Sequence, residues 1–132
     1  RVVREFCSTA GTPGLVVALS DFLDDGDCGE ALQQLADRGH ELYLVQLAGP
    51  EDRLPPWDGE VELLDAESGR LLRVQMDRAS AREYAEAYEA YCREIEYAAL
   101  RNNGRYLSLD TDVPLEDALY GSLMAAGAVS LQ

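Results

Sequence analysis

The residues with the clearest potential for chemistry are Ser20 and Asp21, which follow directly after an aliphatic run at 15–19. A continuous aliphatic run is typical of a parallel strand that is buried on both faces. Open α/β sheets place their ligand and metal groups at the carboxyl ends of such strands. We therefore expect Asp21, together with the Ser20 hydroxyl, at a candidate metal site. Two oxygen donors cannot complete the octahedral shell of Mg²⁺, so the alternative is that Asp21 caps the turn that follows.

The segment after the strand is rich in acids and invites comparison with a calcium loop. Aligned on Asp21, the pattern of an EF-hand would place Leu23 and Leu32 at ligand positions, and the bidentate glutamate is missing. We reject that motif and expect a solvated turn that leads into a helix cap.

Asp110 and Asp112 follow the last predicted core strand. If all the core strands are parallel, both residues leave the sheet at the same end as Asp21. Carboxylates there have the chemistry for acid–base catalysis or for contact with a partner. The simpler expectation is that Asp112 caps the last helix and that Asp110 is solvated.

Two single residues also invite a functional interpretation. His40 is the only histidine, and it follows Gly39 at the opposite end of the predicted strands from Asp21. It cannot join a catalytic triad there, so we expect a structural or surface role. Trp57 lies in a proline-rich loop at 48–59. It either packs that loop onto the following hairpin or anchors a partner, because Trp is enriched in binding hot spots.

The charge balance limits the classes of partner. The 132 residues include 25 acids against 11 bases, for a net charge of −14. Such a surface disfavours nucleic acid, which requires a basic face, and anionic membranes. It favours divalent cations or basic partners. The three cysteines (Cys7, Cys28 and Cys92) have no metal-ligand spacing, so we expect reduced thiols in a cytoplasmic protein. No run of apolar residues is long enough to span a membrane, although a longer parent protein could be membrane-anchored.

The hydrophobic pattern predicts an α/β fold with a βαβ unit. A strand at 15–20 is followed by a helix at 27–38, which starts at an acid-x-x-Glu signal and ends at Gly39. A second strand follows at 41–47. Strand, helix and strand with short connections are typical of a parallel sheet.

The rest of the chain adds a hairpin, two helices and a third core strand. These elements are a hairpin at about 60–76 with Gly69 in its turn, a helix at 81–100 capped by Ser80, a strand at 106–109, and a last helix that is capped by Asp112 and ends near Gly127. Because the chain begins at Arg1 rather than Met, we expect an excerpt or a processed chain. Almost nothing upstream of Leu15 could supply the rest of a metal site, so residues 1–13 are expected to be the end of a helix and a linker from a missing upstream half.

Two of these motifs together resemble a known family. They are the Ser-Asp-Phe-Leu end of the first strand (20–23) and the acid-x-Glu-x-Gly turn of the hairpin (65–69). In this order, with the segments at 35–41 and 107–115, they are similar to the bacterial domain-of-unknown-function family 58, whose core is von Willebrand factor A-like. The resemblance covers most of the chain, roughly Gly14 to Gly127.

The resemblance implies a doubly wound sheet with a metal-ion-dependent adhesion site. In that site an Asp-x-Ser-x-Ser loop, a Thr and a later Asp hold Mg²⁺, and an acidic group of the partner completes the shell. Only the later Asp has a counterpart here, Asp21; the Asp-x-Ser-x-Ser loop is absent and no Thr can be assigned. By this likeness residues 14–132 are the C-terminal portion of the domain, with three core strands, flanking helices and an inserted hairpin. Mg²⁺ is expected in the intact parent domain, and MoxR-type AAA+ ATPases are the implied partner system.

Three hypotheses about function follow. The first is a non-enzymatic protein-interaction module in which Asp21 and Ser20 are the remnant of the metal site, and Trp57, Asp110 and Asp112 contact the partner. The second is a metal-dependent hydrolase that uses the strand-end carboxylates; the sequence offers no nucleophile–base pair and no phosphate-binding glycine loop in its support. The third is a structural fragment that is inert without its upstream half.

The first strand also carries a prediction about assembly. If the upstream half of the sheet is missing, the strand Leu15–Ser20 becomes an edge that is long, apolar and uncharged. Such an edge is a template for pairing with another strand. We therefore expect a homodimer in which two chains pair along this edge.

Overall fold

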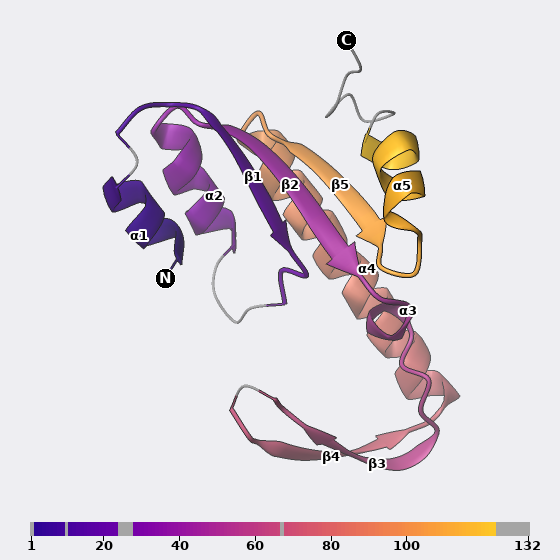
Figure 1. Cartoon of the computed structure of the whole chain (residues 1–132). Helices are drawn as coiled ribbons and strands as arrows, with labels where there is room; N and C mark the ends of the chain where they lie inside the picture. Colours follow the sequence, from indigo (N-terminus) through magenta and orange to yellow (C-terminus); the bar gives the residue numbers. More distant parts are fainter. Residues whose placement is uncertain (1, 10, 24–27, 67, 124–132) are drawn as a thin grey trace.

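The computed structural model describes residues 2–9, 11–23, 28–66 and 68–123. Figure 1 shows a three-stranded sheet with helices behind it and a hairpin that stands apart from it. In chain order the elements are α1 (Val2–Thr9), β1 (Leu15–Ser20), α2 (Cys28–Asp37), β2 (Glu41–Ala48), α3 (Pro50–Arg53), β3 (Gly59–Leu64), β4 (Leu71–Met76), α4 (Arg78–Arg101), β5 (Arg105–Asp110), α5 (Leu115–Asp117) and a π-helical turn η1 (Ala118–Leu123).

The main sheet has the order β1-β2-β5, and all its strands run parallel. The register pairs Ser20 with Gln46 and Gln46 with Ser108, so the carboxyl ends of the three strands meet at one edge. This arrangement confirms the predicted α/β class, and the predicted strands differ from the observed ones by at most one residue at each end. We call this end of the sheet the carboxyl edge.

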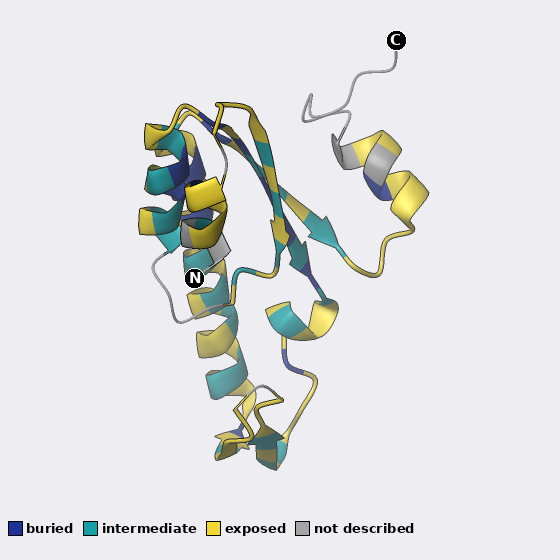
Figure 2. Ribbon diagram, turned by 60° about the vertical axis from the view of Figure 1, so that its left-hand side comes forward, coloured by how far each residue is buried: buried dark blue, intermediate teal, exposed yellow. Residues whose placement is uncertain are grey.

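One face of the sheet forms the hydrophobic core. Leu42 and Leu44 of β2 are buried against Leu32 and Leu35 of α2 and against Ile95 of α4. These positions fit the side-chain periods of strands and helices, because every second residue of the strand and every third or fourth residue of the helices faces the core. Helix α1 packs on α2, so the first residues of the chain belong to the same helical layer. Figure 2 shows this layer on one side of the sheet only.

The prediction that β1 is buried on both faces is wrong. Leu15, Val17 and Leu19 are 60%, 49% and 64% exposed, while Val16 and Ala18 pack against the core. The reason is that β1 is the edge strand of the described sheet, and α5 and η1, which lie on the open side, are close to β5 rather than to β1 (Figure 2). An aliphatic run predicts a strand well, but the number of layers that cover it depends on distant parts of the chain.

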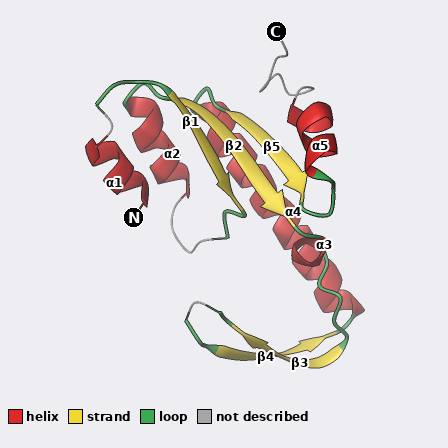
Figure 3. Cartoon of the chain, in the orientation of Figure 1, coloured by secondary structure: helices red, strands yellow, loops and turns green. Residues whose placement is uncertain are grey.

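The hairpin forms a second, antiparallel sheet of β3 and β4 at the start of α4 (Figure 3). Its turn contains Gly69 in the left-handed region, with φ of 70°, as the sequence predicts. Helix α4 begins three residues earlier than predicted. Its cap is Asp77, which accepts a hydrogen bond from the Ser80 amide; the predicted cap, Ser80, lies in the first turn instead.

The last helical segment also differs from the prediction. Pro114 occupies the cap position of α5 and no side chain caps that helix, so the assignment of Asp112 as the cap is wrong. The helix is short because the backbone widens into the π-helical turn at Ala118. Its predicted end near Gly127 lies outside the described residues. Within the described ranges no helix has the length and apolar character needed to cross a membrane.

Candidate functional site

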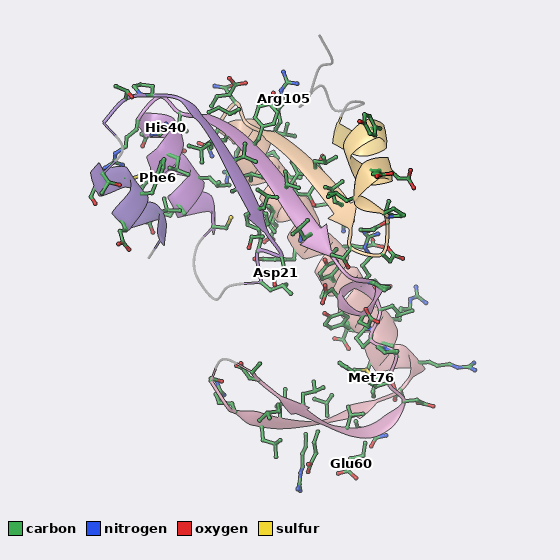
Figure 4. The ribbon with its side chains drawn as sticks, viewed as in Figure 1. Phe6, Asp21, His40, Glu60, Met76 and Arg105 are labelled. Carbon is green, nitrogen blue, oxygen red and sulfur yellow. The ribbon has the colours of Figure 1, made fainter. Side chains whose placement is uncertain are left out.

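The candidate site begins with the turn that leaves β1 at the carboxyl edge (Figure 4). The Ser20 Oγ accepts a hydrogen bond from the Phe22 amide at 3.0 Å, and the Asp21 Oδ1 accepts one from the Leu23 amide at 3.1 Å. Phe22 adopts a left-handed conformation with φ of 58°, which is strained for a bulky residue. Both side chains therefore stabilise a tight turn, and the Asp21 side chain stays exposed at its surface.

Two hydrogen bonds from the interior fix the backbone of this turn. The Gln46 side chain donates to the Asp21 carbonyl at 3.2 Å, and the Tyr91 hydroxyl of α4 donates to the Phe22 carbonyl. Gln46 is fully buried in the middle of β2, and its Oε1 accepts a hydrogen bond from the Tyr106 hydroxyl. Burial raises the pKa of the Tyr106 hydroxyl above its ordinary value of 10.0. We call Gln46, Tyr91 and Tyr106 the turn brace.

The Ser20–Asp21 pair does not by itself fit a magnesium site. Mg²⁺ requires six oxygen ligands in near-ideal octahedral geometry, and protein sites usually supply more than one of them. The two side chains offer one hydroxyl and one carboxylate, and each already accepts a backbone N–H. In the described part of the chain no three His, Cys, Asp or Glu residues converge as a group that could hold a metal ion. The other ligands of an adhesion site would have to come from elsewhere.

The other acids of the carboxyl edge do not join Asp21. Asp110 ends β5, on the far side of β2 from β1, and it forms an ion pair with Arg53 of α3. The Asp110 side chain is 41% exposed, so it is solvated as expected and also has an ionic partner. Asp112 is exposed in the following loop. The carboxylates thus share an edge, as predicted, but Asp21 and Asp110 do not form a catalytic pair across the intervening strand.

His40 and Trp57 take up positions on opposite ends of the molecule. His40 is buried beside Phe6, at the amino end of the strands, and its Nδ1 accepts a hydrogen bond from the Gly14 amide at 3.2 Å. Its role is therefore structural, as predicted, although it also lines a polar pocket of about 450 Å³ with Arg101. Trp57 is 44% exposed in the loop before β3.

Sequence reasoning missed the turn brace. The one signal was Gln46 itself, a polar residue inside the aliphatic run of β2, since a buried amide requires hydrogen-bond partners. The partners could not be read from the pattern, because Asp21 and Tyr106 are 25 and 60 residues away along the chain.

Comparison with known sequences places the chain in a family. The family described as "Protein of unknown function DUF58" matches residues 5–94, which include β1, β2, the hairpin and most of α4. The chain belongs to the DUF58 family. The match covers Ser20, Asp21, Gln46 and Tyr91, so the turn and two members of its brace lie inside the part of the chain that the DUF58 family shares.

The curated relatives are described as uncharacterised proteins. Three uncharacterised mycobacterial proteins, including Rv1480 of Mycobacterium tuberculosis and Mb1516 of Mycobacterium bovis, are 32% identical over 99 residues. The alignment covers 75% of this chain but only 31% of each relative. Among solved structures, the conserved hypothetical protein BatB of Bacteroides thetaiotaomicron aligns with a TM-score of 0.39 and 16% identity, over 97% of this chain and 56% of its own. A match at that level carries no argument about function.

Proposed function

We propose that this DUF58 chain is a non-enzymatic protein-interaction module of the von Willebrand A-like type, which presents its carboxyl edge to a partner. The observation that carries the proposal is the braced turn. A strained backbone conformation persists only where its surroundings hold it, and such strain is concentrated at functional sites. Here the buried Gln46 amide and the half-buried Tyr91 hydroxyl donate to the backbone of the turn that contains Phe22, and the Asp21 carboxylate is exposed on this turn.

The proposal assigns contact roles at this edge. Asp21 and Ser20 would be the part of the adhesion site that this segment contributes, with any Mg²⁺ completed by ligands beyond the described residues. Asp110, Asp112 and Trp57 would be accessory contacts. A MoxR-type AAA+ ATPase system is the partner that the family resemblance suggests, and the net charge of −14 favours a basic contact surface on it.

The test is a binding measurement on a full-length relative that contains this segment, with the MoxR-type ATPase encoded beside it. Asp21→Asn removes the charge and keeps the shape, and we expect it to weaken binding about tenfold. Asp37→Asn, an exposed position at the end of α2 near the amino ends of the strands, is the matched control and should leave affinity unchanged. Equal affinities of the two variants would contradict the proposal.

A further inference from the structure

Three tyrosines lie along one face of helix α4. Tyr84, Tyr88 and Tyr91 are four and three residues apart, which is the spacing that places side chains on the same face of a helix. The first and the last are two helical turns apart, or about 10 Å along the axis. The Tyr84 and Tyr88 rings stack, with their centroids 6.4 Å apart and an angle of 15° between their planes. We call these three residues the tyrosine row.

The hydroxyls at the two ends of the row donate to two different loops of the carboxyl edge. The Tyr91 hydroxyl donates to the Phe22 carbonyl, in the turn after β1. The Tyr84 hydroxyl donates to the Asp52 carbonyl of α3, which follows β2, at 2.9 Å. A single helix therefore contacts both loops, and the helical repeat fixes the spacing between the two contacts.

Each of these loops is also held from the sheet. Gln46 of β2 donates to the Asp21 carbonyl at 3.2 Å, in the turn after β1. Arg53 of α3 forms an ion pair with Asp110 at the end of β5. Each loop thus has one anchor in the sheet and one anchor in α4. Without the hydroxyl from α4, a loop loses one of its two anchors, and backbone with fewer contacts opens more readily.

From these contacts we propose that Tyr84 and Tyr91 are positioning residues, which hold α3 and the Asp21 turn in place so that a partner meets both loops as one surface. Tyr84 is 38% exposed, so its ring contributes less to the core than a buried aromatic residue would, while its hydroxyl bonds to the backbone of α3. Loops that are ordered before binding reduce the entropy that association costs. The inference rests on the proposed function for the use of this edge, but the positioning itself can be measured without a partner.

Tyr91→Phe tests the contact with the turn after β1. The variant removes one hydroxyl and keeps the ring, so it should fold. The NMR coupling between the amide and α protons of Phe22 reports its φ of 58°, and we expect it to change because the turn then also samples unstrained conformations. The Leu23 amide, which donates to the Asp21 carboxylate, should exchange with solvent about fivefold faster.

Tyr84→Phe makes the same change at the other end of the row. The Leu54 amide donates to the Pro50 carbonyl of α3, and we expect its exchange to become about fivefold faster, with no change in the turn after β1. Tyr97→Phe is the matched control, because Tyr97 lies nearer the carboxyl end of α4 and is 62% exposed. This control should alter neither loop.

The pattern of the changes separates positioning from a merely structural role. A structural role would speed exchange throughout α4, whereas positioning predicts faster exchange in one loop for each variant. Unchanged coupling and exchange in Tyr91→Phe, unchanged exchange in Tyr84→Phe, or the same changes in Tyr97→Phe would overturn the proposal.

These measurements need no partner, so their outcome is independent of the binding test of the proposed function. If Asp21→Asn weakens the binding of the MoxR-type ATPase, Tyr91→Phe should weaken it about threefold. An unchanged affinity of Tyr91→Phe in that case would also overturn the positioning role. If Asp21→Asn leaves the affinity unchanged, the proposed function fails, and the coupling and exchange measurements still decide whether the tyrosines hold the two loops.

Discussion

Phe22 shows how a local conformation depends on residues far from it in the chain. A bulky residue at φ of 58° is unfavourable by roughly 1–3 kcal/mol, so the turn must gain as much from its contacts. The Ser20 and Asp21 side chains supply local hydrogen bonds, and the turn brace supplies two more from β2 and α4. Removal of either set should loosen the position of the Asp21 carboxylate.

Gln46→Leu tests the brace. The variant keeps nearly the same volume but removes the hydrogen bonds that Gln46 makes with the Tyr106 hydroxyl and the Asp21 carbonyl. Each such hydrogen bond stabilises a protein by about 0.5–1.5 kcal/mol, and we expect the loss of both in the free energy of unfolding measured with urea. Gln75→Leu, on the exposed face of β4, is the control and should change stability by less than about 0.5 kcal/mol. If both variants lose the same amount, Gln46 does not brace the turn.

A magnesium titration tests the ligand set of the turn. Because Ser20 and Asp21 supply only two donors, we expect no saturable binding of Mg²⁺ by this chain at millimolar concentration. The measurement follows the amide signals of Phe22 and Leu23 in EDTA and then in excess Mg²⁺. A saturable shift that Asp21→Asn abolishes would show instead that this chain holds a competent cation site.

At the scale of elements, the Asp77 cap makes the stability that helix α4 contributes depend on pH. The Ser80 amide donates to its carboxylate and lowers the pKa of Asp77 below the ordinary value of 3.8. A lowered pKa in the folded state means that the cap stabilises the protein above pH 3.8 and that this stabilisation is lost as the pH falls through the lower, folded value.

We therefore expect Asp77→Ala to lower the Tm at neutral pH and to have progressively less effect below pH 3.8. Thermal unfolding followed by circular dichroism across this range gives the comparison. Asp112→Ala removes an exposed aspartate that caps no helix, and its Tm should equal that of the unchanged chain at every pH. If Asp77→Ala lowers the Tm by the same amount down to the lowest pH, the stabilisation by the cap does not depend on the charge of Asp77.

The elements themselves were predictable because their signals are local. The βαβ unit follows from aliphatic runs and from Gly39, which takes φ of 80° at the end of α2, and the hairpin follows from Gly69. Caps were less predictable, since Asp77 and Ser80 stand three residues apart and either can begin a helix. The exposure of β1 was not predictable, because it depends on which elements cover the open face.

At the scale of the whole molecule, β1 has an open edge, and a homodimer that pairs along this edge stays a prediction. The Gly14 carbonyl accepts from the Glu41 amide, so the alternation of a parallel ladder turns the N–H and C=O groups of Leu15, Val17 and Leu19 away from β2. Antiparallel pairing centred on Val17 would place Leu15 against Leu19 of a second copy. Helix α1 packs on α2 in the helical layer (Figure 1), so it does not pair with this edge.

Light scattering on the chain tests this prediction. We expect a mass that approaches twice the 14.5 kDa of a single chain. Val17→Lys places a charge on the edge and should restore monomers, whereas Leu71→Lys, on the hairpin, should not. Monomers throughout, or dimers that survive Val17→Lys, would exclude pairing along β1.

The partner proposed for this module is expected to bind at the carboxyl edge of the sheet. Hydrogen exchange read by mass spectrometry on a full-length DUF58 relative, alone and with the MoxR-type ATPase that is proposed as its partner, tests this most directly. We expect added protection in the segment equivalent to 20–23, and none around His40 at the amino end of the strands. Protection confined to that amino end, or no change at 20–23 when the ATPase is bound, would contradict binding at the carboxyl edge.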